Sequence, residues 1–525
     1  MKPSRPNQKL QELLGTALIG TGREAVAAPD QQSSNSVDKL LATKSGASTA
    51  HTLLTQAGVY TLYQQIGQEN LHRLPPPETT VAPPFRHQPM PEPATNLLRD
   101  LCENSELSLL QDFLIYITKE QWHIPSEQLP RLLTLGRKNS RLRPFVTEAM
   151  DDVGRWLARQ QSDWHYALWP ENNWDGLLDQ FKHSASNDRL PLLRWCRQND
   201  PARGLRLLKD NWSLVPDGMR TQLLQALQDQ LSELDEPFLE RCLDDRHITT
   251  RRKAQELLAS IPTSNFSQRM ITHGRLFMQW HPRRKTPLTV SIPSEHTVEM
   301  QRDGITNMTE KKQSMYLSKR LTTLAGAIPL DYWTDPANNI GLDIPHFLEL
   351  VSLSKWTRTL LTGLVAATHR QKRPDWAHAL IQWGWGGSYE KLTLRNTNLL
   401  TPEQFTELVD QACDEQYPKE PLKTNNLLTH LLRSWKRPWP EPAAILMLQV
   451  ISHHLSQQHP EKTPDAGTKN SIRQFFSLIP ADLASEANKT MAQHKGLHPH
   501  WKSTIDRGLK TLRYRQELEE ITKRK

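Results

Sequence analysis

The chain is poor in glycine and contains no long hydrophobic run. Glycine accounts for 22 of its 525 residues, against 37 prolines. This ratio is typical of many short helices ended by proline, and it argues against sheets joined by glycine-rich turns. No stretch approaches the roughly 18 consecutive apolar residues that a membrane-spanning helix needs. We therefore expect a helical protein without membrane segments.

Cysteine is also scarce, with four residues that occur singly: Cys102, Cys196, Cys242 and Cys413. No two of them have the spacing of a disulfide framework or a zinc site, so we expect buried free thiols. Free thiols are typical of a reducing compartment, which predicts a cytoplasmic location. The N-terminal segment imitates a signal peptide, but Gln11 and Glu12 interrupt its apolar part and favour an amphipathic helix instead.

Recognisable motifs of catalysis, metal binding and cofactor binding are missing as well. Residues 15–22, GTALIGTG, resemble a phosphate-binding loop, but the lysine is absent and the glycines fall within a predicted helix. The 20 histidines are dispersed, and no HExxH, paired CxxC or GxSxG motif occurs. We therefore assign no catalytic, metal or cofactor-binding residue and expect a protein that is not an enzyme. An active site assembled from residues far apart in sequence stays open as an alternative.

The clearest structural signal lies in residues 235–269, which predict two short helices folded back on each other. Asp235 is the expected N-cap of the first helix, and Pro237 suits its first turn. In the second helix one face is apolar, with Ala254, Leu257, Leu258 and Ile261, and Pro262 ends it. Such a pair cannot bury both of its apolar stripes alone, so it needs neighbouring pairs of the same kind.

Similar apolar stripes elsewhere predict an all-α fold, an α-solenoid of HEAT-like helical pairs. The expected regions are N-terminal helices with polar and proline-rich loops (1–93), HEAT-like repeats (94–280), an irregular insertion (281–345) and C-terminal helices (346–525). Within the insertion, residues 287–293 alternate like a short strand, and the prolines and polar residues nearby indicate either an irregular segment or a small β-hairpin. In the C-terminal region, Thr401 and Gln404 have the spacing of a capping box.

Basic residues outnumber acidic ones only modestly, 65 against 57, for a net charge of +8. Two basic clusters form a possible interaction surface: Arg251, Arg252 and Lys253, and Arg283, Arg284 and Lys285. The simplest interpretation of both clusters is a solvated surface. Arg251 occupies a HEAT-like position, where we expect it to bridge to turn aspartates. The second cluster is free to meet phosphate or an acidic partner.

Several segments together resemble a known family. They are ALIGTGR (17–23), GRWLARQQSDW (154–164), DEPFLERCLDDR (235–246) with the following Arg251 and Ala254, and residues 501–515. The chain thereby resembles an uncharacterised bacterial family of helical proteins. Its members are commonly encoded beside a MoxR-type AAA ATPase, a von Willebrand factor A-domain protein and a SWIM zinc-finger protein. The resemblance implies no catalytic residue. It does imply that the protein functions as an accessory to such an ATPase system.

Two functions follow as hypotheses. The first is a non-catalytic scaffold or adaptor for protein partners, with the MoxR-type ATPase or the von Willebrand factor A-domain protein as the expected partner. The alternative is a nucleic-acid-binding HEAT-like protein, which the net charge and the two basic clusters favour. A uniformly basic concave groove would favour nucleic acid, whereas a groove of mixed polar and apolar lining would favour the scaffold.

Overall fold

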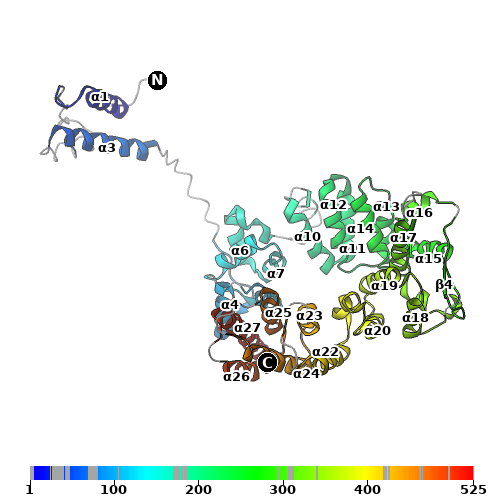
Figure 1. Ribbon diagram of the computed structural model, residues 1–525. Coiled ribbons are helices and arrows are strands. Elements are labelled where there is room, and N and C mark those ends of the chain that lie inside the picture. Colours follow the sequence, from blue (N-terminus) through cyan, green and yellow to red (C-terminus); the bar gives the residue numbers. More distant parts are fainter. Residues whose placement is uncertain are drawn as a thin grey trace. The chain divides into compact units, whose positions relative to one another are not determined.

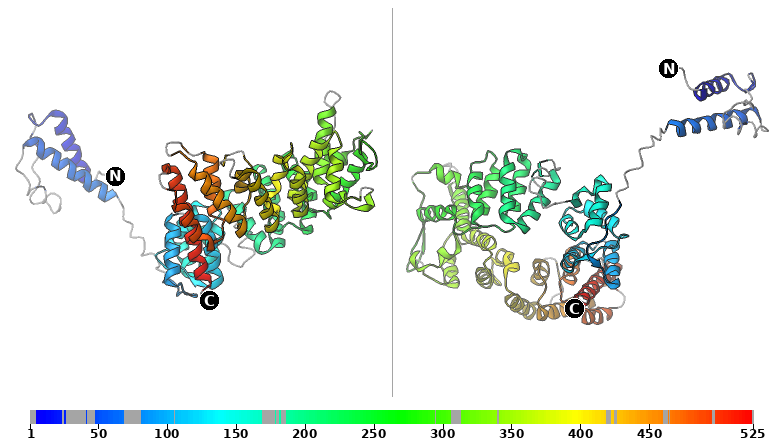
Figure 2. Two further views of the ribbon diagram at one scale, coloured as in Figure 1. Left: turned by 60° about the horizontal axis from the view of Figure 1, so that its bottom comes forward. Right: turned by 180° about the vertical axis from the view of Figure 1, so that it is seen from behind.

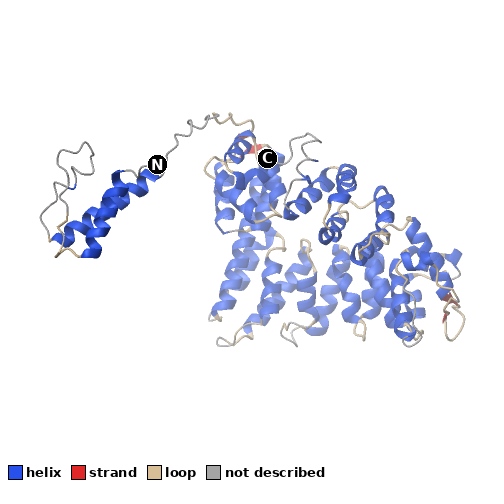
Figure 3. Cartoon of the chain, turned by 90° about the horizontal axis from the view of Figure 1, so that it is seen from above, coloured by secondary structure: helices blue, strands red, loops and turns tan. Residues whose placement is uncertain are grey.

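The computed structural model is mostly helical, which confirms the prediction of an all-α fold (Figure 3). It describes residues 5–523 except 24, 27–40, 42–47, 69–80, 105, 169–177, 179–180, 183–185, 294, 306–312, 339–340, 418–421, 424–425, 460–462, 464 and 495–496. Among the described helices, none combines the length and the apolar character that crossing a bilayer requires.

The chain divides into two compact units, residues 1–81 and 82–525. In the first unit, α1 (Arg5–Ile19) packs against α3 (Thr49–Gln68). Its small core contains Leu13, Leu41 and Tyr60. Most of the polar loop and the start of the proline-rich connector that we expected within residues 1–93 lie outside the described residues.

The second unit begins with a group of short helices around a common core. They are α4 (Glu92–Asn104), α5 (Leu107–Glu120), α6 (Leu129–Lys138), α7 (Arg143–Ala149), α8 (Asp152–Gln160) and the 3-10 helix η1 (Ser162–Leu168). Two short parallel strands, β1 (Gln88–Pro89) and β2 (Trp122–His123), border this group. Leu98, Phe113 and Leu133 are fully buried in its core, so the apolar stripes of three different helices meet there.

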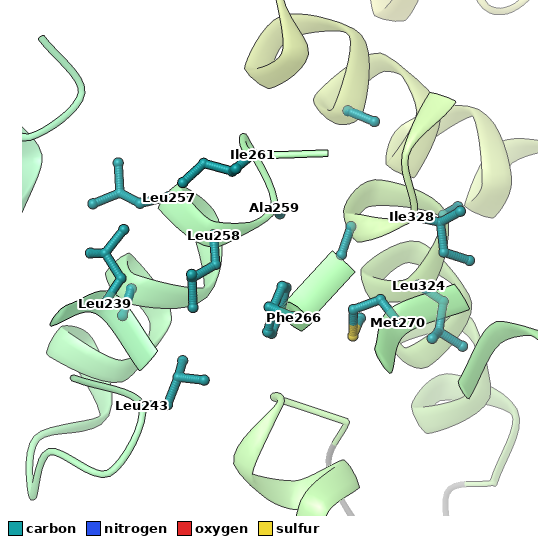
Figure 4. Close-up of a cluster of buried hydrophobic side chains, with 14 of the residues drawn as sticks. Leu239, Leu243, Leu257, Leu258, Ala259, Ile261, Phe266, Met270, Leu324 and Ile328 are labelled. Atoms are coloured by element: carbon teal, nitrogen blue, oxygen red, sulfur yellow. The ribbon is translucent and has the colours of Figure 1, made fainter. Parts of the chain in front are cut away.

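The next stretch contains the helical pair predicted from residues 235–269. Its elements are α10 (Ser186–Asn199), α11 (Pro201–Asn211), η2 (Trp212–Leu214), α12 (Asp217–Ala226), η3 (Glu233–Asp235), α13 (Glu236–Cys242), α14 (Ile248–Leu258) and α15 (Asn265–Phe277). α13 packs against α14 as expected, while α10, α12 and α14 contact one another in succession. Figure 4 shows Leu257 and Leu258 of α14 in the cluster that continues through Phe266 to Leu324.

Residues 278–343 contain the expected hairpin but also a long helix. β3 (Met278–Trp280) pairs antiparallel with β4 (Leu288–Val290), and α16 (Val298–Arg302), α17 (Gln313–Ala327), η5 (Leu330–Trp333) and η6 (Pro336–Asn338) follow. The prediction of an irregular segment over 281–345 was therefore wrong for α17. Leu317, Leu321, Leu324 and Ile328 recur at helical spacing and are buried. The polar residues before this stripe obscured its period.

The remaining helices continue to the C-terminus and contact neighbours two elements away. They are α18 (Ile344–Ser352), α19 (Thr357–Gln371), α20 (Pro374–Gly384), α21 (Glu390–Thr393), η7 (Leu394–Leu399), α22 (Pro402–Gln416), α23 (Leu427–Ser434), α24 (Glu441–Ser456), α25 (Ala466–Phe476), η8 (Ala481–Leu483), α26 (Ala484–Ala492) and α27 (Pro499–Lys523). α17 packs against α19, α22 against α24, and α23 against α25. The capping box of Thr401 and Gln404 is confirmed at the start of α22.

The last helix lies beside the first helices of the second unit. α27 packs against α25 on one side and against α4 on the other (Figure 2). Lys510 Nζ of α27 donates a hydrogen bond to Asn104 Oδ1 of α4, over 2.9 Å, and Tyr514 of α27 is buried in the core of the α4 group. The two ends of this unit are thus joined directly by side-chain contacts.

Asp235 does not cap α13 as the sequence predicted. Its side chain makes no capping bond to that helix, and its backbone is helical, with φ −80° and ψ −22°. Instead its carboxylate accepts two bonds of 2.9 Å from the guanidinium of Arg197 on α10 and one of 3.0 Å from the Ser232 amide. Arg197, which is distant in the sequence, thus binds the Asp235 carboxylate that the local sequence predicted to cap α13.

The four cysteines are free and buried, as predicted. Burial raises the pKa of the Cys196 and Cys242 thiols to about 12, and that of Cys102 and Cys413 to about 11. Because the thiolate is the reactive form, we expect almost no reaction of the native protein with Ellman's reagent at pH 8. All four thiols of each chain should react once urea unfolds the protein. Rapid stoichiometric labelling of the folded protein would contradict this burial.

Candidate binding groove

Two adjoining pockets lined by residues of α14, α17 and α19 form the candidate site, here called the α14 groove. Figure 1 labels the three helices. The volumes of the two pockets are about 490 and 420 Å³, and Glu256, Ala366 and Arg370 line both of them. Along α14 and the turn that follows it, the lining extends from Ile248 to Ser260. At a rise of 1.5 Å per residue, this makes the groove roughly 18 Å long.

The amphipathic pattern of α14 explains why this helix presents a polar wall. Ala254 and Leu258 are fully buried and face the core, whereas Arg252 and Glu256 are exposed. Helical periodicity separates the two sets, because residues three or four apart share a face. The same stripe that anchors α14 in the core therefore directs its charged residues towards the groove.

The opposite wall depends on a close approach between α17 and α19 at Gly363. A Cβ atom at this position would lie 2.7 Å from the Cβ of Ala325 and 2.7 Å from the carbonyl oxygen of Thr322. Only glycine avoids this overlap, so the two helices can pack with their backbones almost in contact. The small side chain of Ala366, one turn further along α19, leaves space where the two pockets meet.

Cations from three elements line the groove. Arg252 lies on α14, Lys319 on α17 and Arg395 on η7, and all three are exposed. Within the part of the chain that the structure describes, none of the three has an ion pair or a side-chain hydrogen bond. These positive charges are therefore available to a ligand.

The two carboxylates of the groove are already paired. Glu256 Oε2 lies 3.0 Å from Lys253 Nζ. Asp303 is fully buried, accepts two bonds of 2.9 Å from Arg269, and lies 3.2 Å from Nε2 of His273. Burial opposes ionisation of Asp303, but the bonds from His273 and Arg269 outweigh it and hold its pKa below the usual value. Neither carboxylate is thus free to neutralise the three cations.

Two buried polar atoms of residues that line the larger pocket have no hydrogen-bond partner among the described residues. One is the donor Nε of Arg370, whose guanidinium also bonds to the carbonyl of Gly326. The other is the acceptor Oδ1 of Asn396, whose Nδ2 donates to the Val365 carbonyl over 3.0 Å. Burial lowers the pKa of Arg370, yet a guanidinium stays charged at neutral pH. Buried polar atoms are normally satisfied, so a ligand in this pocket that turns the two side chains towards it would supply their missing bonds.

The structure brings one of the two predicted basic clusters to the groove. Arg252 and Lys253 line it, and so does Arg251. However, Arg251 Nη1 donates to the backbone carbonyls of Asp245 and Arg246, over 2.8 and 3.1 Å, and not to a turn carboxylate. The expected bridge was wrong because Arg220, 2.9 Å away, already occupies the Asp245 carboxylate.

The second predicted cluster lies elsewhere. Arg283, Arg284 and Lys285 are exposed in the turn that joins β3 to β4, and they line neither pocket of the groove. Sequence reasoning missed Lys319, Arg370, Arg395 and Asn396, which do line it. None of them belongs to a run of three basic residues like the two predicted clusters, so no local motif marks them. Their convergence depends on how α17, α19 and η7 pack.

Metal binding has no candidate among the described residues, where no group of three or more His, Cys, Asp or Glu side chains is placed to hold an ion. Fold and site together define a helical protein with a groove of mixed polar and apolar lining, whose charged residues are mainly basic. Over residues 12–522 the chain matches the model of a family of unknown function (DUF5691), and it belongs to this family. Neither the curated proteins nor the solved structures contain a match.

Proposed function

We propose that the protein is a non-catalytic adaptor, an α-solenoid of HEAT-like helical pairs that holds a protein partner in the α14 groove. The succession of contacts between elements two apart supports the solenoid, because stacked helical pairs bury their stripes in this way. The α14 groove is the observation that carries the proposal. It combines unpaired cations with two unpartnered buried polar atoms.

The lining of the groove favours a protein over a nucleic acid. Apolar and uncharged side chains such as Ile248, Val365 and Ala366 alternate with the cations. Channels for single-stranded nucleic acid stack bases on exposed aromatic rings. Phe266, the aromatic residue among the described lining, is 1% exposed and cannot offer its ring. A mixed surface of this kind suits a polypeptide, which supplies apolar, polar and charged groups together.

The first partners to test are those that the family resemblance implies, a MoxR-type ATPase and a von Willebrand factor A-domain protein. Tagged wild-type chain would be mixed with each purified protein and recovered by affinity capture. Ala366→Trp should fill the junction of the two pockets and release the partner, because the added indole occupies the space that the ligand needs. Ala202→Trp places the same side chain at an exposed position of α11 and should retain the partner.

Urea melts of both variants would establish that they fold like the wild type. If the captured wild-type chain brings down neither the MoxR-type ATPase nor the von Willebrand factor A-domain protein, the result would count against the adaptor role. Retention of the partner by a folded Ala366→Trp variant would remove the groove from the proposal.

A further inference from the structure

We infer that the α14 groove recognises an acidic peptide segment, a run of aspartate or glutamate residues on the protein partner. The inference rests on the proposed adaptor function and specifies the chemistry of its ligand. Two independent observations support it: the unpaired cations around the groove and the two unpartnered atoms inside it.

The cations require a ligand with several negative charges. Arg252, Lys319 and Arg395 come from three elements that border the same groove, and both carboxylates of the groove already pair with other cations. Like charges gathered around a cavity repel one another, so a neutral ligand would leave that repulsion in place. Carboxylates relieve it and accept charge-assisted hydrogen bonds, in bidentate form from arginine.

The unpartnered atoms favour a peptide over a free anion. Arg370 Nε needs an acceptor, which a phosphate, a carboxylate or a peptide carbonyl could each provide. Asn396 Oδ1 needs a donor, and an ionised phosphate or carboxylate has none. A peptide backbone offers a carbonyl and an N–H group at every residue except proline, so it can satisfy both atoms at once when the two buried side chains turn towards the pocket.

The size of the groove agrees with a short extended segment. A groove roughly 18 Å long accommodates about five or six residues at approximately 3.3 Å per residue. Ile248, which lines the smaller pocket and is 51% exposed, offers an apolar surface for the methylene groups of glutamate. The ligand class is therefore an extended acidic stretch about as long as the groove.

The test is fluorescence anisotropy with the full chain and a labelled peptide of about six glutamates, the length derived from the groove. A glutamine peptide of the same length is the uncharged control. We expect the glutamate peptide to bind, with an affinity that falls as salt rises. Lys319→Glu combined with Arg395→Glu should weaken binding roughly ten- to a hundredfold, because two charge-assisted bonds become repulsive contacts.

The matched control is Arg283→Glu combined with Arg284→Glu, which makes the same charge change on the β3–β4 turn and should leave binding within about twofold. All four positions are exposed, so the variants should fold. Three results would overturn the inference: equal binding of the glutamine peptide, an equal loss in the turn variant, or tighter binding of a single-stranded oligonucleotide of equal charge.

Failure of the inference and failure of the adaptor role give different results. If neither peptide binds but Ala366→Trp still releases the partner protein, the acidic specificity is wrong and the adaptor role stands. If the glutamate peptide binds in the groove but Ala366→Trp retains the partner, the adaptor role of the groove is wrong.

Discussion

Replacing Asp235 by alanine should lower the free energy of unfolding by about 3–5 kcal/mol, the usual cost of removing one member of a buried ion pair. Asp235 and Arg197 are 0% and 1% exposed. The guanidinium also donates to the backbone carbonyls of residues 201, 227, 229 and 230. Without the carboxylate, a full positive charge would stay buried against carbonyl groups alone.

The matched control for this variant is Asp210→Ala. Asp210 pairs with Arg206 on the exposed side of α11, where the two side chains are 45% and 69% exposed. Loss of such a pair should cost at most about 1 kcal/mol. Urea unfolding followed by circular dichroism would compare the two variants. Equal midpoints for Asp235→Ala and Asp210→Ala would show that the buried pair does not hold α10 to η3 as described.

Leu257→Ala should cost about 2–5 kcal/mol, because it removes buried methylene groups and leaves a void beside α13. Leu257 is 2% exposed and belongs to the cluster that joins α13, α14, α15 and α17 (Figure 4). In a stacked array each pair is stabilised by its neighbours, so the loss should spread beyond α14. Hydrogen exchange of the flanking helices would measure that spread.

Arg252→Ala is the control on the same helix. Its side chain is exposed, and its loss should change stability by no more than about 0.5 kcal/mol. Urea melts of the two variants should therefore differ clearly. If both melt like the wild type, α13 and α14 do not pack as a stacked pair.

Periodicity in the sequence predicted much of the helical structure but little of its long-range chemistry. The α13–α14 pair and the capping box of Thr401 and Gln404 were predictable, because both depend on residues within a few positions of each other. The cap at Asp235 and the carboxylate bridge of Arg251 were wrong. In both cases a distant arginine, Arg197 or Arg220, takes the carboxylate concerned.

The candidate site was less accessible to sequence analysis. The triplet of Arg251, Arg252 and Lys253 was visible because its charges are adjacent, and it does line the groove. The equally visible triplet at 283–285 does not. Lys319 and Arg395 belong to no basic triplet, and only the packing of α17, α19 and η7 brings them to the same groove.

The central claim, that an acidic segment occupies the α14 groove, is tested most directly by a fluorescent label at its edge. The native thiols are buried, so Gln301→Cys, at an exposed residue of the groove lining, should accept a dye selectively and leave the junction at Ala366 open. Thr286→Cys provides the same label on the β3–β4 turn. Addition of the glutamate peptide carrying a quencher should dim the dye at position 301 and leave the dye at position 286 unchanged. Quenching at 286 without quenching at 301 would contradict the claim.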